Sequence, residues 1–129
     1  MPWTVEYFAD GAEVTYTGKI SGAEILQAKA DAFAHEYPRK ARWVVCDFSQ
    51  VQEFEIAKDD IDRIVRQDLR EAARNPELAE CVIATRPYEY GLARMWEMQV
   101  DAQETRTHVA RNRAEADSWL RSHGLREQA

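Results

Sequence analysis

Hydrophobic and polar residues at the start of the chain follow the alternation of β-strands. The stretch from Trp3 to Phe8 is rich in residues that favour strands, and Asp10-Gly11 is a dipeptide typical of tight hairpin turns. A second stretch of this kind, from Glu13 to Thr17, follows the turn. These segments are therefore predicted to form an antiparallel hairpin, which Gly18 ends.

Four later segments carry apolar residues at the three- and four-residue spacing of helices. The first runs from Ser21 to about Tyr37, and Ser21 and Glu24 have the spacing of a capping box. The second helix is predicted from Asp59 to Asn75, the third begins at Pro87, and the fourth is capped by Asn112 and ended by Gly124. The predicted inward faces of the four helices, in chain order, are Leu26, Ala30, Phe33 and Tyr37; Ile61, Ile64, Val65, Leu69, Ala72 and Ala73; Leu92, Met95, Trp96 and Gln99; and Ala116, Trp119 and Leu120.

Two uninterrupted apolar runs, Arg42 to Phe48 and Cys81 to Thr85, are typical of strands covered on both faces. A more polar run, Arg106 to Ala110, suits an edge strand. The elements then follow the order β-β-α-β-α-β-α-β-α, which predicts an α/β fold with a five-stranded mixed, mainly parallel sheet. We expect a single domain over residues 1–125, a long loop at 49–58 and a frayed tail at 126–129.

Composition and charge narrow the classes of partner. The net charge of −6 opposes non-specific binding to nucleic acid, which depends on cationic side chains. No apolar run approaches the length of a membrane span, and the N-terminus lacks the pattern of a secretory signal, so a soluble, cytoplasmic protein is expected. Cys46 and Cys81 each lie in an apolar run and are expected to be buried, reduced thiols, with a disulfide between neighbouring strands as the alternative.

Three motifs resemble the SpoIIAA-like fold of STAS domains, and in particular a branch of small, mostly uncharacterised bacterial proteins. Val45 to Ser49 is similar to an apolar strand that ends in an Asp-Leu-Ser-type motif. Ala84 to Glu97 is similar to the third helix of that branch, and Val109 to Leu120 to its closing strand and helix. The resemblance covers nearly the whole chain and implies a SpoIIAA-like sheet covered by helices.

The chain departs from signalling STAS proteins at one functional position. Those proteins carry a phosphoacceptor serine just before the second helix, whereas this chain reads Glu55-Ile56-Ala57-Lys58-Asp59 there. No serine or threonine lies between Val51 and Lys58. The phosphorylation switch that the resemblance would imply is therefore not expected here.

The carboxyl ends of the strands are the expected location of a site, because ligands of open α/β sheets bind where the helices begin. Two segments would form its walls, the 49–58 loop and the turn from Arg86 to Tyr90. In the turn, Arg86 and free helix amides would hold a small anion, with Arg94 one helical turn further on. Alternatively, Arg86 pairs with Glu89, and Tyr88 and Tyr90 pack against neighbouring residues. The candidate ligand-binding residues are Asp47, Ser49, Phe54, Ile56, Arg86, Tyr88, Tyr90 and Arg94.

Other residues at this edge leave further alternatives open. Phe54 and Ile56 would form a lid over an apolar ligand, a surface for a partner, or simple packing onto the second helix. Asp47 is the best single candidate for an acid or base, but a lone carboxylate at a strand end more commonly caps the following loop. Exposure of Trp3 or Trp96 on one face would indicate a homodimer.

No pattern of catalytic or metal-binding residues stands out. The three histidines are scattered, and neither a zinc spacing, a glycine-rich phosphate loop nor a GxSxG turn is present, so no cofactor and no metal are expected. The leading hypothesis is a non-enzymatic binding or interaction module for a protein partner or a small anionic or apolar ligand. A carrier of a small apolar or amphipathic, lipid-like molecule is the second hypothesis, and a small hydrolase-type enzyme is the third.

Overall fold

A computed structural model describes residues 2–103 and 105–125, and the expected tail at 126–129 lies outside this part of the chain. The elements follow the predicted order, which confirms the α/β class. They are β1 (Trp3–Tyr7), β2 (Gly11–Ser21), α1 (Gly22–Ala34), β3 (Trp43–Glu55), α2 (Lys58–Arg74), β4 (Ala79–Ile83), α3 (Pro87–Val100), β5 (Thr107–Ala110) and α4 (Arg113–Ser122).

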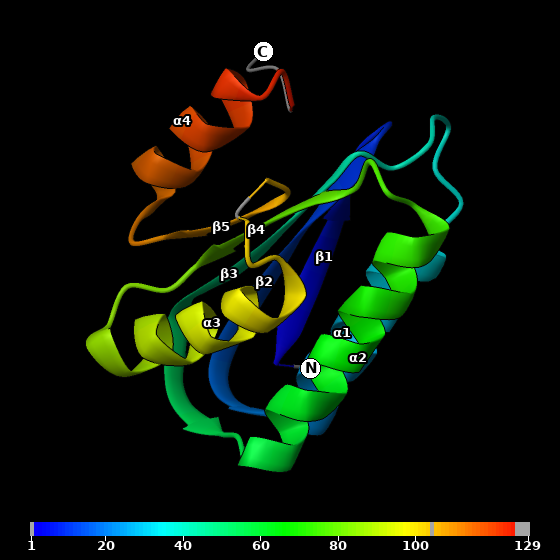
Figure 1. Cartoon of the computed structure of the whole chain (residues 1–129). Helices are drawn as coiled ribbons and strands as arrows, with labels where there is room; N and C mark the ends of the chain where they lie inside the picture. The colour runs from blue at the N-terminus through cyan, green and yellow to red at the C-terminus, as the bar shows by residue number, and fades with distance from the viewer. Residues whose placement is uncertain (1, 104, 126–129) are drawn as a thin grey trace.

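The strands form a single mixed sheet in the order β1-β2-β3-β4-β5. The hairpin of β1 and β2 is antiparallel, as predicted, and the other three pairings are parallel. Each crossover helix leads to the next strand in the same direction across the sheet, so α1, α2 and α3 all lie on one face and α4 lies on the other (Figure 1). The carboxyl ends of β2, β3, β4 and β5 therefore meet at one edge.

Alternate residues of β3 point into two separate hydrophobic cores. Val44 and Cys46 point into the larger core beneath α1, α2 and α3, whereas Trp43 and Val45 point into the smaller core beneath α4. Burial on both faces explains why this strand reads as an uninterrupted apolar run. Cys46 and Cys81 are free and buried, as expected, and they belong to the two different cores.

The predicted loop at 49–58 is wrong, because β3 continues as far as Glu55. The extension pairs with the second half of β2, which likewise continues past its predicted end at Gly18. Gly18 adopts the left-handed conformation, with φ of 66°, beside an irregularity in the pairing register. A glycine therefore marks a bulge within the strand rather than its end.

The capping box of α1 and the Asn112 cap of α4 are as predicted, but the inward faces of three helices differ. Ser21 and Glu24 form the capping box, with nitrogen–oxygen distances of 2.9 and 3.2 Å. The fully buried face of α1 is Ile25, Ala28, Lys29 and Ala32, and the helix ends at Ala34. Of the predicted residues, Leu26, Phe33 and Tyr37 are partly buried against the core, whereas Ala30 is exposed. In α2, the predicted Leu69 and Ala73 are exposed. In α3, Trp96 is buried as predicted, whereas Met95 and Gln99 face solvent.

Candidate functional site

The eight candidate residues lie at the carboxyl edge and the adjoining part of α3, but they do not form one cluster. Phe54 and Ile56 belong to the face of the sheet that α1, α2 and α3 cover, where they pack against the larger core. Asp47 instead contacts Arg113 of α4, on the opposite face. The sheet itself therefore separates the candidate residues into two groups.

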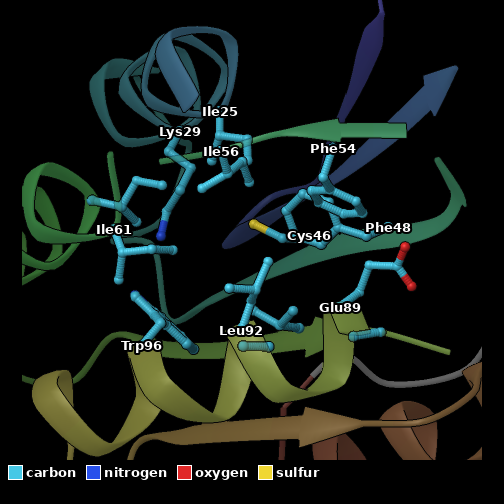
Figure 2. A pocket seen from close by; sticks show the side chains of 14 residues that line it. Ile25, Lys29, Cys46, Phe48, Phe54, Ile56, Ile61, Glu89, Leu92 and Trp96 are labelled. Atoms are coloured by element: carbon cyan, nitrogen blue, oxygen red, sulfur yellow. The ribbon is translucent and has the colours of Figure 1, made fainter. Parts of the chain in front are cut away.

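An apolar cavity of about 60 Å³ lies on the α1–α3 side of this edge (Figure 2). Phe54 borders it from the extension of β3 and Ile56 from just after that strand, whereas Leu92 and Ala93 border it from α3. Lys29 and Trp96 lie at one end of the cavity, and Phe48, Phe54 and Glu89 at the other (Figure 2). Phe54 and Ile56 thus line a partly open cavity as well as packing against the core.

Arg86 joins the two predicted walls of the site. Its Nε and Nη2 atoms donate to the buried carboxylate of Glu89, at 2.9 and 2.5 Å. The same guanidinium donates to the carbonyl oxygen of Val51 at 2.5 Å and to that of Gln52 at 3.4 Å. These carbonyls lie beyond the last β3–β4 pair, so Arg86 braces the free edge of the β3 extension. The alternative that Arg86 pairs with Glu89 is confirmed.

Tyr88, Tyr90 and Arg94 differ in how free their side chains are to contact a ligand. Tyr88 is largely exposed, whereas Tyr90 is half-buried and carries the Arg111 guanidinium 4.4 Å from its ring centre. Arg94 forms an ion pair with the buried carboxylate of Glu97. A ligand at this turn therefore meets Tyr88 as a free aromatic group, while Arg94 and Arg86 already hold carboxylates.

Asp47 connects three elements on the α4 side. Its Oδ1 atom accepts a hydrogen bond from the Ser49 amide at 2.9 Å, and its Oδ2 atom lies 2.8 Å from the Arg113 guanidinium. Arg113 also pairs with Glu13 of β2. Burial disfavours the charged guanidinium, but Glu13 and Asp47 outweigh this effect and raise the pKa of Arg113. The interpretation that Asp47 caps the following backbone is confirmed.

A buried polar cluster at the inner end of the cavity was not predicted. Lys29 of α1 is only 3% exposed, and its Nζ lies 2.5 Å from Asp68 Oδ2 of α2 and 3.0 Å from Glu80 Oε2 of β4. The Trp96 indole of α3 donates to the same Asp68 oxygen at 2.6 Å. The cluster therefore links all three helices of this face to the sheet.

The charges of this cluster determine its protonation. Burial disfavours the ammonium form of Lys29, but the two carboxylates outweigh burial and raise its pKa. Burial, together with the charge of Asp68, raises the pKa of Glu80 to about 8, although Lys29 opposes the shift. At neutral pH the cluster is therefore a Lys29–Asp68 ion pair beside a largely protonated Glu80.

A weak signal for this cluster exists in the sequence. Lys29 lies four residues after Ile25 and three before Ala32, so a correctly placed helical face contains a lysine among apolar residues. Asp68 lies in the same way between Ile64 and Ala72. The wrong assignment of the α1 face concealed the first residue, and no local pattern indicates that the two residues meet.

The described residues offer little support for catalytic chemistry. No group of three or more metal-ligating side chains is found among residues 2–103 and 105–125. Ser122 Oγ lies 3.1 Å from His123 Nδ1, but the hydroxyl is also 2.8 Å from the carbonyl oxygen of Trp119, and Nδ1 is 2.9 Å from that oxygen. Both groups therefore cap the exposed end of α4.

Comparisons with known proteins bear on the fold alone. No family model matches the chain, and no curated protein matches it. Among solved structures, the anti-sigma factor antagonist SpoIIAA in its unphosphorylated form superposes with a TM-score of 0.56 and 12% identity, over 92% of this chain and 97% of that one. An uncharacterized protein of the DUF3478 family from Shewanella loihica PV-4, described as having a SpoIIAA-like fold, superposes with a TM-score of 0.55 and 12% identity, over 92% and 91% of the two chains. The chain therefore has a SpoIIAA-like fold, as the sequence motifs predicted.

Proposed function

We propose that this STAS-like chain is a non-enzymatic interaction module that binds an apolar segment of a protein partner at the carboxyl end of its sheet and along α3. The observation that carries the proposal is an apolar stripe on the solvent side of α3. Tyr88, Met95 and Met98 are 61%, 52% and 64% exposed, and together with Gly91 they recur every three or four residues. We call these four residues the α3 stripe.

Gly91 adds an independent argument. Apart from the neighbouring backbone of the helix itself, a Cβ atom at this position would meet no atom within 4 Å, so packing inside the protein does not require a glycine. The helix nevertheless carries the cost of glycine, roughly 1 kcal/mol relative to alanine. Close packing of the helix against a strand therefore does not explain Gly91. A partner whose backbone approaches α3 at Gly91 would account for the residue.

The side chains of the stripe suit a protein partner. Tyrosine contributes contact area with little loss of conformational entropy, and methionine adapts to irregular apolar surfaces. Phe54 and Ile56, at the rim of the cavity near the start of α3, extend the apolar surface. Trp3 and Trp96 are both buried, so the anticipated sign of a homodimer is not present, and a second copy of this chain is an outcome of the test below.

We propose a protein partner rather than a lipid because of the size of the cavity. Ligand pockets for molecules of drug size enclose about 300 Å³ or more. The cavity of about 60 Å³ is too small for a fatty acyl chain. No helix in the described ranges is both long and apolar enough to span a bilayer. Two buried free thiols are consistent with a reducing compartment, and we propose that the partner is met in the cytoplasm.

Site-specific photocrosslinking tests the α3 stripe. A photoreactive phenylalanine analogue at position 88 or 95 should give a discrete adduct in a lysate of the source organism, and the same analogue at the exposed Ala23 of α1 should not. The further substitution Gly91→Lys places a charge in open space, so it should leave folding intact and abolish the adduct. Ala23→Lys is the matched control and should leave the adduct unchanged.

Three outcomes decide the proposal. An adduct that depends on Gly91 supports it, and the mass of the adduct distinguishes another protein from a second copy of the chain. Absence of any adduct from both stripe positions would overturn it. An adduct of equal yield with Gly91→Lys would equally overturn it, because the crosslink would then not report binding at the stripe.

A further inference from the structure

The cavity that Phe54, Ile56 and Leu92 border is distinct from the α3 stripe and combines two features. Its walls are mainly apolar, with Ile25, Ile61 and Ile64 contributed by α1 and α2. Its inner end is formed by the Lys29 ammonium and the Trp96 ring, whose centre lies 5.1 Å from Nζ (Figure 2). An apolar space that ends at a buried cation has the polarity of an amphipathic molecule.

The volume limits the size of such a molecule. A space that holds one water corresponds to roughly 10–15 Å³ on the same measure. The cavity of about 60 Å³ is thus large enough for about four to six atoms of that size. Water is a poor occupant of the outer part, because a buried water needs two or more polar partners and most of this lining is hydrocarbon.

The charges around Lys29 select among polar groups. The ammonium has three N–H donors, and Asp68 and Glu80 each present one oxygen to it, at 2.5 and 3.0 Å. One donor therefore remains for a further acceptor. A third carboxylate would add a negative charge to a cation that already faces two carboxyl groups, whereas a neutral oxygen would not.

We propose that this cavity is a binding site for a small neutral amphipathic molecule, such as a short-chain ketone, whose oxygen accepts a hydrogen bond from Lys29 and whose alkyl chain lies among Ile25, Ile61 and Leu92. The site goes beyond the proposed protein interaction and shares with it only Phe54 and Ile56 at the rim, since no residue of the α3 stripe lines the cavity. The Arg86 brace, which holds Val51 and Gln52 of the β3 extension, lies beside the part of the wall that contains Phe54.

A titration with methyl ketones tests the site. The probes are acetone, butanone, methyl propyl ketone, methyl butyl ketone and methyl hexyl ketone, and the readout is the NMR signal of the Trp96 indole N–H, identified by its loss in Trp96→Phe. Affinity should rise about fourfold for each added methylene until the cavity is filled, since each buried methylene contributes about the same free energy. It should then fall for the longest ketone.

Ligand charge and cavity volume provide the controls. Butyrate, which is close in size to methyl propyl ketone but carries a carboxylate, should bind at least tenfold more weakly. Lys29 is left in place, because its removal would leave buried carboxylates unpaired, so the ligand is changed instead. Ala93→Leu should fill the cavity from α3 and weaken the ketones at least tenfold, whereas Ala23→Leu on the exposed side of α1 should have no effect.

Each contrary result overturns the proposal. If no ketone shifts the Trp96 signal, the space is closed or holds only water. If Ala93→Leu binds the ketones as well as the parent protein does, the molecules bind elsewhere. If butyrate binds as tightly as methyl propyl ketone, the inner end does not select a neutral acceptor. None of these results depends on the α3 stripe, because Gly91 and Ala93 face different sides of α3.

Discussion

Lys29 of α1 and Asp68 of α2 form a buried ion pair, with 2.5 Å between Nζ and Oδ2. Neither side chain is more than 3% exposed, and both lie beside the Trp96 indole of α3. A buried pair of this kind need not stabilise a fold more than apolar residues of similar shape would, because both charges lose their hydration. Its geometry nevertheless sets how α1 and α2 face each other.

Substitution of one partner of this pair should be far more costly than substitution of both. Lys29→Met leaves Asp68 charged and buried without its cation, and we expect a loss of about 3–5 kcal/mol in the free energy of unfolding. The double variant Lys29→Met with Asp68→Leu should recover at least 1 kcal/mol relative to the sum of the two single losses. Urea denaturation measures all three variants. Additive losses would show that the two residues are not coupled.

Glu80 should make the protein less stable as the pH rises. Its pKa is about 8 in the folded state, against an ordinary value of 4.5, because burial and the charge of Asp68 disfavour the carboxylate. The folded state therefore binds a proton that the unfolded state has lost, so the free energy of unfolding should fall between about pH 4.5 and 8 and then level off. Thermal unfolding between pH 5 and 9 measures this trend.

Glu80→Gln isolates this contribution, because glutamine keeps the shape but does not titrate. The variant should lose less stability than the parent protein between pH 6 and 8.5, by at least about 1 kcal/mol, since one pKa unit corresponds to about 1.4 kcal/mol. The groups that face Glu80 are Lys29 of α1, Asp68 of α2, Cys46 of β3 and Tyr16 of β2. Glu77→Gln, at an exposed position, is the control. If the free energy of unfolding changed equally with pH in the parent protein, Glu80→Gln and Glu77→Gln, the raised pKa of Glu80 would be contradicted.

The sequence predicted the element order because burial leaves a strong local pattern. Val44 and Cys46 alternate with Trp43 and Val45, and a run that is apolar at every position can belong only to an element covered on both sides. The β3 extension was missed although Phe54 and Ile56 alternate with Glu53 and Glu55. Its partner strand contains Gly18, and a glycine in a bulge has the same local signature as a glycine that ends a strand.

The candidate site was predicted less completely because its contacts join distant segments. The Arg86–Glu89 pair has helical spacing and was anticipated. The bonds from Arg86 to Val51 and Gln52, and the cluster of Lys29 with Asp68, depend on how β3 packs beside α3 and α1 beside α2. Spacing along one segment carries no information about such contacts.

Arg86→Ala should loosen the end of β3. The substitution removes the donors to two carbonyls and leaves the buried Glu89 carboxylate without its cation. We expect a loss of roughly 1–3 kcal/mol and faster amide hydrogen exchange in residues 51–56. Arg63→Ala, which breaks an exposed pair with Asp60, should change stability by less than about 1 kcal/mol and leave exchange in this segment unaltered. Unchanged exchange in Arg86→Ala would show that the guanidinium does not brace the extension.

Alanine at Gly91 and alanine at Gly18 should have opposite effects on stability. Gly91 lies in a helix with open space around its Cβ position, so Gly91→Ala should raise the free energy of unfolding by about 0.5–1 kcal/mol. Gly18 also has open space, but its φ of 66° is left-handed, so Gly18→Ala should lower the free energy by about 1–2 kcal/mol. Because the Cβ position is open at both sites, the opposite signs of the two changes in the free energy of unfolding come from the backbone conformation alone. Thermal unfolding of the two variants measures both changes. A destabilised Gly91→Ala would mean that the free protein itself needs this glycine, which would remove the argument that Gly91 is kept for a partner.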